Sequence, residues 1–149
     1  MIRRVLIFIL AGLLAACSAL QPGGEALPAL NDSWTITLTQ SGGFIGISRT
    51  VTITSDGKVV AVDDREGQTA TLQLTPQEIA SLKVEISKAR LKTPIQTETG
   101  CADCFVYDLQ IKTAGPNFSV QLDDVNLPES GLQPLIMYLQ DLMNRALSV

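Results

Sequence analysis

The feature that most constrains the fold is a strict alternation of apolar and polar residues in two stretches of the first half. In residues 34–39 every second residue is apolar, and in residues 49–55 the pattern returns with Val51 and Ile53. A period of two is typical of β-strands that bury one face. The intervening residues are mostly threonines, which suit a pleated surface facing water. These stretches predict an antiparallel sheet with one wet face.

A third strand and a helix are expected next. Asp56-Gly57 is a strong signal for a two-residue hairpin, so residues 58–62 should return as a strand and residues 63–67 should form a charged loop. Residues 75–90 carry apolar side chains at helical spacing. The sequence Thr75-Pro76-Gln77-Glu78 predicts a capping box at the start of this helix.

The second half predicts two strands and a closing helix. Residues 105–112 and 118–122 alternate on either side of a turn at residues 114–117. The last helix is strongly amphipathic, and Ser130 with Gln133 predicts a second capping box. The element order is therefore βββαββα. This order predicts a two-layer α+β domain, an antiparallel sheet with two helices packed on one face.

The N-terminus has the layout of a secretory signal. Two arginines, at positions 3 and 4, precede an apolar run over residues 5–14. The run is shorter than the about 20 residues that a membrane span requires. It ends in Leu14-Ala15-Ala16-Cys17, which resembles the bacterial lipobox, in which the cysteine becomes a lipid-bearing N-terminus. The alternative is an ordinary signal peptide with an incidental cysteine.

Lipidation of Cys17 would determine where the protein works. Residues 1–16 would be removed as a signal peptide, residues 17–33 would form the lipidated cysteine and a flexible tether, and residues 34–149 would form one α+β domain. Each buried methylene contributes about 0.8 kcal/mol to membrane attachment, and two acyl chains make a stable anchor. We expect an extracytoplasmic protein, lipid-anchored to the bacterial cell membrane or outer membrane.

The composition argues against an enzyme and against nucleic-acid binding. No histidine is present, which excludes Ser-His-Asp and Cys-His nucleophile systems and nearly all catalytic zinc sites. Residues 17–149 hold nine basic and fifteen acidic residues with no Lys/Arg cluster, so nucleic acid is not an expected partner. Asp63-Asp64 and Asp123-Asp124 are interpreted as solvated loop charges. We expect no catalytic residue, no metal and no cofactor.

Cys101 and Cys104 are the cysteines that remain once Cys17 carries lipid. Two thiols in an oxidising compartment are expected to form a disulfide. A thioredoxin-like redox pair would need its first cysteine at a helix N-terminus, whereas this pair leads into a strand. A zinc site would need two further ligands, and no histidine can supply them.

The glycine-rich connection over residues 42–46 is the stretch that local structure explains least. A hairpin needs glycine, but it does not need Phe44 and Ile45 between the glycines. Exposed apolar residues at such a tip would suit insertion into the pocket of a partner protein. In the alternative, both side chains fold back onto the edge of the core.

Residues 41–46 followed by Arg49 resemble the opening hairpin of the emfourin family, small inhibitors of thermolysin-like metalloproteases. The resemblance continues in the second half, where it is carried by Asp103, Phe105-Val106-Tyr107-Asp108-Leu109, Asp123-Asp124, Pro128, Leu135, Leu139 and Leu142. It implies an α+β fold and protease inhibition. The candidate partner-binding loop then consists of Gly42, Gly43, Phe44, Ile45, Gly46 and Arg49.

The chain also differs from the emfourins that it resembles, which are unanchored cytoplasmic proteins without a lipobox or a Cys-x-x-Cys. The sequence therefore predicts a lipid-anchored, non-enzymatic binding protein whose partner is a metalloprotease or another envelope protein. An envelope scaffold or ligand-binding lipoprotein without inhibitory activity is the alternative. A thiol-disulfide oxidoreductase using Cys101 and Cys104 is the third hypothesis.

Overall fold

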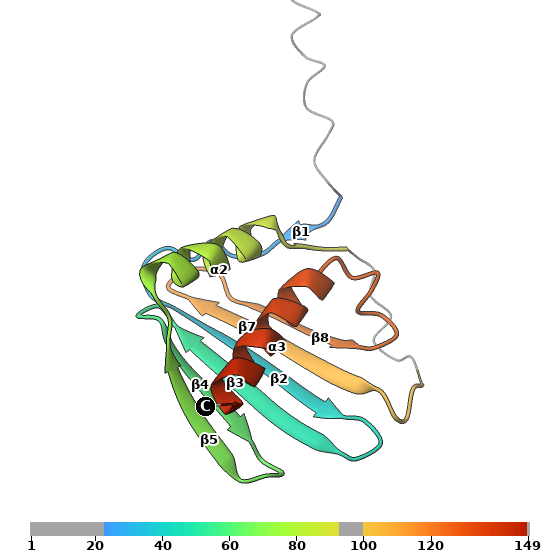
Figure 1. Ribbon diagram of the computed structural model, residues 1–149. Helices are drawn as coiled ribbons and strands as arrows, with labels where there is room; N and C mark the ends of the chain where they lie inside the picture. Colours follow the sequence, from blue (N-terminus) through green and yellow to red (C-terminus); the bar gives the residue numbers. More distant parts are fainter. Residues whose placement is uncertain (1–22, 93–99, 149) are drawn as a thin grey trace, which may run out of the picture.

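Six antiparallel strands form one sheet, and the two helices of the described chain lie on the same face of it (Figure 1). The computed structural model describes residues 23–92 and 100–148. In chain order the elements are β1 (Glu25–Ala26), β2 (Trp34–Gly42), β3 (Ile47–Thr54), β4 (Lys58–Asp63), β5 (Gln68–Gln73), α2 (Pro76–Lys88), β6 (Arg90–Leu91), β7 (Phe105–Thr113), β8 (Phe118–Asp123) and α3 (Gln133–Leu147). The strand order is β5-β4-β3-β2-β7-β8, and β1 pairs with β6 separately. The predicted α+β architecture is confirmed.

The alternation in the strands produces the buried face of the sheet. Leu38 of β2 lies opposite Val51 of β3 and Leu109 of β7 in the strand register. Directly opposite residues point to the same face, so this register joins the apolar positions of neighbouring strands into continuous rows. All three side chains are at most 1% exposed. The predicted inward positions are therefore the core of the domain.

Helix α3 covers this apolar face (Figure 1). Its inward side chains include Ile136 and Leu139, both fully buried. The predicted capping box at its start is wrong, because the helix begins later and Leu132 is the N-cap residue. Gly131 has a φ of +79°, which interrupts helical geometry between Ser130 and the helix. The Ser130 hydroxyl instead accepts a hydrogen bond from the Leu132 N–H at 3.0 Å.

Helix α2 begins at the predicted capping box. The Thr75 N–H donates to the Glu78 carboxylate at 2.8 Å, and the Glu78 N–H donates to the Thr75 hydroxyl at 3.3 Å. Glu78 also accepts a hydrogen bond from Arg145 of α3 at 2.7 Å, which links the two helices. The helix ends at Lys88 rather than at the expected Arg90, because Arg90 turns into β6.

Strand β5 was not predicted from the sequence. It follows β4 in the chain, before α2, and lies at the edge of the six-stranded sheet, next to β4. Its register places Leu72 opposite Val59 and Ala70 opposite Ala61. An edge strand buries only part of its inner face, so small and polar residues are tolerated there. The alternation of apolar and polar residues in β5 is therefore weak.

The domain also begins earlier than predicted. The sequence assigned residues 17–33 to a flexible tether, but β1 pairs with β6 in antiparallel register. Leu27 and Leu30 are 8% and 7% exposed and belong to the core. The sequence did not reveal this, because two leucines in a Gly- and Pro-rich segment show neither a strand nor a helix period. Each leucine still buries apolar surface. No helix in the described ranges is long and apolar enough to cross a membrane.

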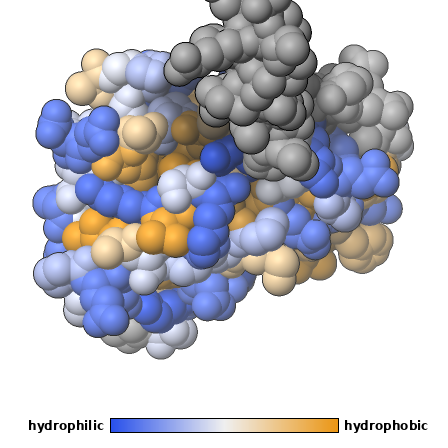
Figure 2. Space-filling model, turned by 90° about the horizontal axis from the view of Figure 1, so that it is seen from above, coloured by the Kyte–Doolittle hydropathy of each residue, from blue (hydrophilic) through white to orange (hydrophobic). Residues whose placement is uncertain are grey.

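The face seen in Figure 2 mixes hydrophobic and hydrophilic residues. Seen from above, the hydrophobic residues form short stretches between hydrophilic ones (Figure 2). Met137, on the outward side of α3, is 58% exposed, whereas Leu139 on the same helix is fully buried. This pair provides a matched comparison of an inward and an outward position.

We expect Leu139→Ala to lower the free energy of unfolding by about 2–5 kcal/mol, because a buried leucine leaves a cavity that the neighbours fill only in part. Met137→Ala should change it by less than about 0.5 kcal/mol. Urea unfolding followed by Trp34 fluorescence measures both. Equal effects of the two substitutions would contradict the assigned inner face of α3.

Candidate functional site

The β2–β3 hairpin ends in a closed turn that presents two large apolar side chains to solvent. The Gly46 N–H donates to the Gly43 carbonyl at 3.0 Å, which closes the turn. Phe44 and Ile45 occupy its two central positions and are 91% and 61% exposed. Of the two arrangements left open by the sequence, the structure therefore has the presented one. We call residues 43–46 the tip.

Glycine is required at three positions around the tip. Gly42, Gly43 and Gly46 have φ values of +93°, +72° and +61°, a region that residues with a side chain rarely adopt. A Cβ on Gly42 would lie 2.5 Å from the Cys104 carbonyl oxygen, and one on Gly43 would collide with the Phe105 ring. At Gly46 the space is open, so only the backbone conformation requires glycine there.

A disulfide lies against one side of the tip. Cys101 and Cys104 are joined, with their Cα atoms 5.5 Å apart, immediately before β7. The Cys104 carbonyl accepts a hydrogen bond from the Gly43 N–H at 3.1 Å. The cysteine pair, expected only to form a disulfide, therefore also contacts the base of the candidate binding loop through the Cys104 carbonyl.

Asp124 holds the start of β7 in place. Its carboxylate accepts the Phe105 N–H at 2.8 Å and the Tyr107 hydroxyl at 2.9 Å. Burial, and then the neighbouring carboxylate, raise the pKa of Tyr107 to about 12, so the phenol stays protonated and continues to donate. Asp123 accepts the N–H groups of Val125 and Asn126, both at 3.0 Å. The interpretation as solvated loop charges is therefore wrong for Asp123, which is 9% exposed. Asp124 is exposed as expected, but its carboxylate also organises the backbone.

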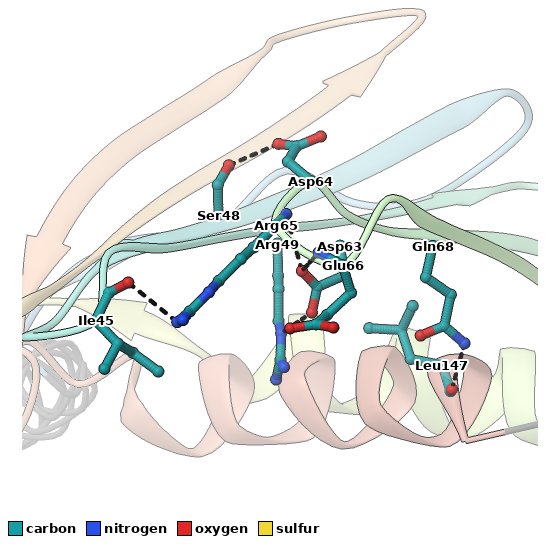
Figure 3. Close-up of polar contacts among 9 residues, drawn as sticks. All are labelled: Ile45, Ser48, Arg49, Asp63, Asp64, Arg65, Glu66, Gln68 and Leu147. Atoms are coloured by element: carbon teal, nitrogen blue, oxygen red, sulfur yellow. Dashed lines mark hydrogen bonds and ion pairs between the residues drawn. The ribbon is translucent and has the colours of Figure 1, made fainter.

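Asp63 organises the neighbouring β4–β5 turn (Figure 3). Its side chain is 4% exposed, and it accepts a hydrogen bond from the Arg49 Nε at 2.6 Å. Its other oxygen accepts the backbone N–H groups of Arg65 and Glu66, each at 3.1 Å. The Glu66 N–H and then the Arg49 guanidinium lower the pKa of Asp63 from 3.8, against the opposing effect of burial. Asp63 is therefore not the solvated loop charge that the sequence suggested.

Arg65 connects this turn to the tip. Its guanidinium donates to the Ile45 carbonyl at 3.1 Å, and next to it the Ser48 hydroxyl donates to Asp64 at 2.6 Å (Figure 3). Sequence reasoning missed Arg65, because the contact joins two loops that only the pairing of β3 with β4 brings together. The tip is thus held by Cys104 on one side and by Arg65 on the other.

Arg49 is not part of the tip. It lies on β3, opposite Gln40 of β2 and Asp63 of β4, and both of these residues are buried on the helix-covered side. Its side chain is 35% exposed and its guanidinium engages Asp63. The structure therefore brings together five of the six residues of the candidate loop. Arg49 instead pairs with Asp63, next to the β4–β5 turn.

Cys17, the expected site of lipid attachment, lies outside the described residues. Within residues 23–92 and 100–148, no group of three or more His, Cys, Asp or Glu side chains is placed to hold a metal ion. Comparison of the chain with protein-family models, curated proteins and solved structures found no match.

We expect Asp63→Asn to lower the melting temperature at neutral pH, because the amide cannot replace a carboxylate that accepts three hydrogen bonds. A carboxyl group whose pKa is lowered on folding stabilises the protein above its ordinary pKa of 3.8 and loses this effect as the pH falls through its folded pKa. The difference between wild type and variant should therefore shrink below pH 3.8. Thermal unfolding at several pH values measures it.

Glu66→Gln is the matched control, because it neutralises an exposed carboxylate in the same turn. Its melting temperature at neutral pH should stay close to that of the wild type. A difference between Asp63→Asn and wild type that grows with acidification would contradict the assigned role of Asp63.

Proposed function

We propose that this chain is a lipid-anchored, non-enzymatic binding protein of the cell envelope, and that it inserts Phe44 and Ile45 into an apolar pocket of a partner protein. The supporting observation is the 91% exposure of Phe44 at the end of a closed turn. A large aromatic side chain that is exposed to solvent and held away from the core is a typical anchor residue of a protein interface.

The way the tip is held favours binding. Burying a phenylalanine contributes about 1.5–3 kcal/mol, or roughly 10- to 100-fold in Kd. Part of such a gain is lost when a flexible loop must be ordered on binding. Here the hydrogen bonds from Gly43 to Cys104 and from Arg65 to Ile45 already restrict the backbone. Gly46 has no side chain and has open space beside it, so a partner can also approach the main chain closely there.

A thermolysin-like metalloprotease is the partner class that we propose. The support is the resemblance of residues 41–46 to the opening hairpin of emfourin-type inhibitors, together with a presented apolar pair that suits a hydrophobic substrate pocket. In the wider form of the proposal, the partner is another envelope protein and the chain is a scaffold or ligand-binding lipoprotein.

A soluble version comprising residues 18–149 should inhibit thermolysin at micromolar concentration. Phe44→Ala should weaken inhibition roughly 10- to 100-fold, because it removes most of the apolar surface that the pocket would bury. Met137→Ala, which truncates an exposed apolar side chain on α3, should leave inhibition unchanged. Steady-state assays with a peptide substrate measure the inhibition constants.

Absence of inhibition by the wild type would contradict the protease form of the proposal. The wider form then predicts a partner in a pull-down from detergent-solubilised membranes that is recovered by the wild type and by Met137→Ala but lost with Phe44→Ala. Equal recovery by all three proteins would overturn the role of the tip.

The anchor is tested separately. Full-length protein should incorporate labelled palmitate and sediment with membranes, and Cys17→Ser should do neither, because the thiol that would carry the lipid is missing. Membrane sedimentation of the Cys17→Ser protein would contradict lipid anchoring.

A further inference from the structure

We infer that the Cys101–Cys104 disulfide is a redox-sensitive brace for the tip, whose reduction loosens residues 43–46 while the sheet stays folded. The contacts behind this inference do not depend on the identity of any partner. Its consequence for binding, a weaker complex in the reduced form, rests on the proposed function.

The brace acts through one hydrogen bond beyond the end of the β2–β7 ladder. The last pair of that ladder is Gly42 with Phe105. The bond from the Gly43 N–H to the Cys104 carbonyl, at 3.1 Å, extends the same register by one position. It is the first contact outside the regular strand, so it depends on how the residues just before β7 are held. The disulfide to Cys101 constrains those residues.

The rest of the sheet does not depend on the disulfide. Strand β2 pairs with β7 at nine positions, from Trp34 opposite Thr113 to Gly42 opposite Phe105. Phe105 is also fixed from the other side, because Asp124 accepts its N–H and donates its own N–H to the Phe105 carbonyl. A disulfide that closes so short a loop removes little entropy from the unfolded chain. Its main effect is therefore local.

The disulfide is open to a reductant. Cys101 is exposed and Cys104 is partly exposed, and exposed disulfides are among the more readily reduced. The chemical class of reductant is a dithiol, such as a protein with a Cys-x-x-Cys pair. One thiolate of the dithiol attacks a sulfur of the Cys101–Cys104 bond, and the second thiolate resolves the mixed disulfide. The bond takes up two electrons and two protons to give two thiols, and the dithiol leaves as a disulfide.

Loosening the base of the tip would weaken partner binding. In the oxidised form the backbone of Gly43 is held, so Phe44 is presented in one arrangement. In the reduced form the tip samples more conformations, and the cost of ordering it is added to binding. The Arg65 contact to Ile45 remains on the other side, so the tip is loosened rather than released.

Residue-resolved amide hydrogen exchange tests the brace without a partner. The full chain in detergent micelles is compared by NMR before and after treatment with dithiothreitol. The amides of Gly43 and Gly46 should exchange up to about tenfold faster after reduction, the effect of losing one hydrogen bond. The amides of Ile36 and Leu38, in the middle of β2, should keep their protection.

The double variant Cys101→Ser/Cys104→Ser is the control, and its tip amides should exchange fast with and without dithiothreitol. Unchanged exchange at Gly43 in the reduced wild type would overturn the inference. Equal acceleration at Leu38 would overturn it as well, because the disulfide would then stabilise the whole sheet. Should Phe44→Ala leave binding intact while reduction still loosens the tip, the proposed function fails and the brace stands.

Discussion

Burial of one face of the sheet under α3 is the constraint on which the rest of the structure depends. Ile36, Leu38 and Leu109 are fully buried, and so are Ile136 and Leu139 of the covering helix. Each such side chain contributes a few kcal/mol when it leaves water, and the sum offsets the entropy of ordering the chain. Because side chains along a strand alternate, this burial also fixes the register of every strand pair, since a slip by one residue would turn the apolar set toward water. The opposite face carries mainly threonines on β2 and β3.

The same register places charged residues at the tip end of the buried face. The row after the apolar ones holds Gln40, Arg49 and Asp63. A carboxylate removed from water is costly unless it is paired and hydrogen-bonded. Asp63 meets both conditions, because it accepts one bond from Arg49 and two from the turn that follows it. Asp124 is exposed, and its carboxylate accepts hydrogen bonds from the Phe105 N–H and the Tyr107 hydroxyl at the start of β7. Two carboxylates thus hold the segments that flank the tip.

The tip illustrates how a rigid sheet can support an exposed apolar pair. Phe44 and Ile45 cannot reach the core, because the turn closed by Gly43 and Gly46 directs them outward. Positive φ values at the glycines make this conformation inaccessible to most other residues. The arrangement places two exposed apolar side chains side by side at one point. In the proposed function, such a point would suit a concave pocket of the partner better than a flat surface.

Period and local chemistry in the sequence determined the main strands, both helices, the Thr75 capping box and the cysteine pair, because each of these depends on residues close together in the chain. The exposure of Phe44, the burial of Asp63 and the contact of Arg65 with the tip depend on which strands become neighbours, and a single sequence does not encode that locally. Leu27 and strand β5 were missed for a related reason, since a short or edge segment buries too few side chains to show a period. Local pattern therefore established the main strands and both helices, and strand pairing decided what surrounds the tip.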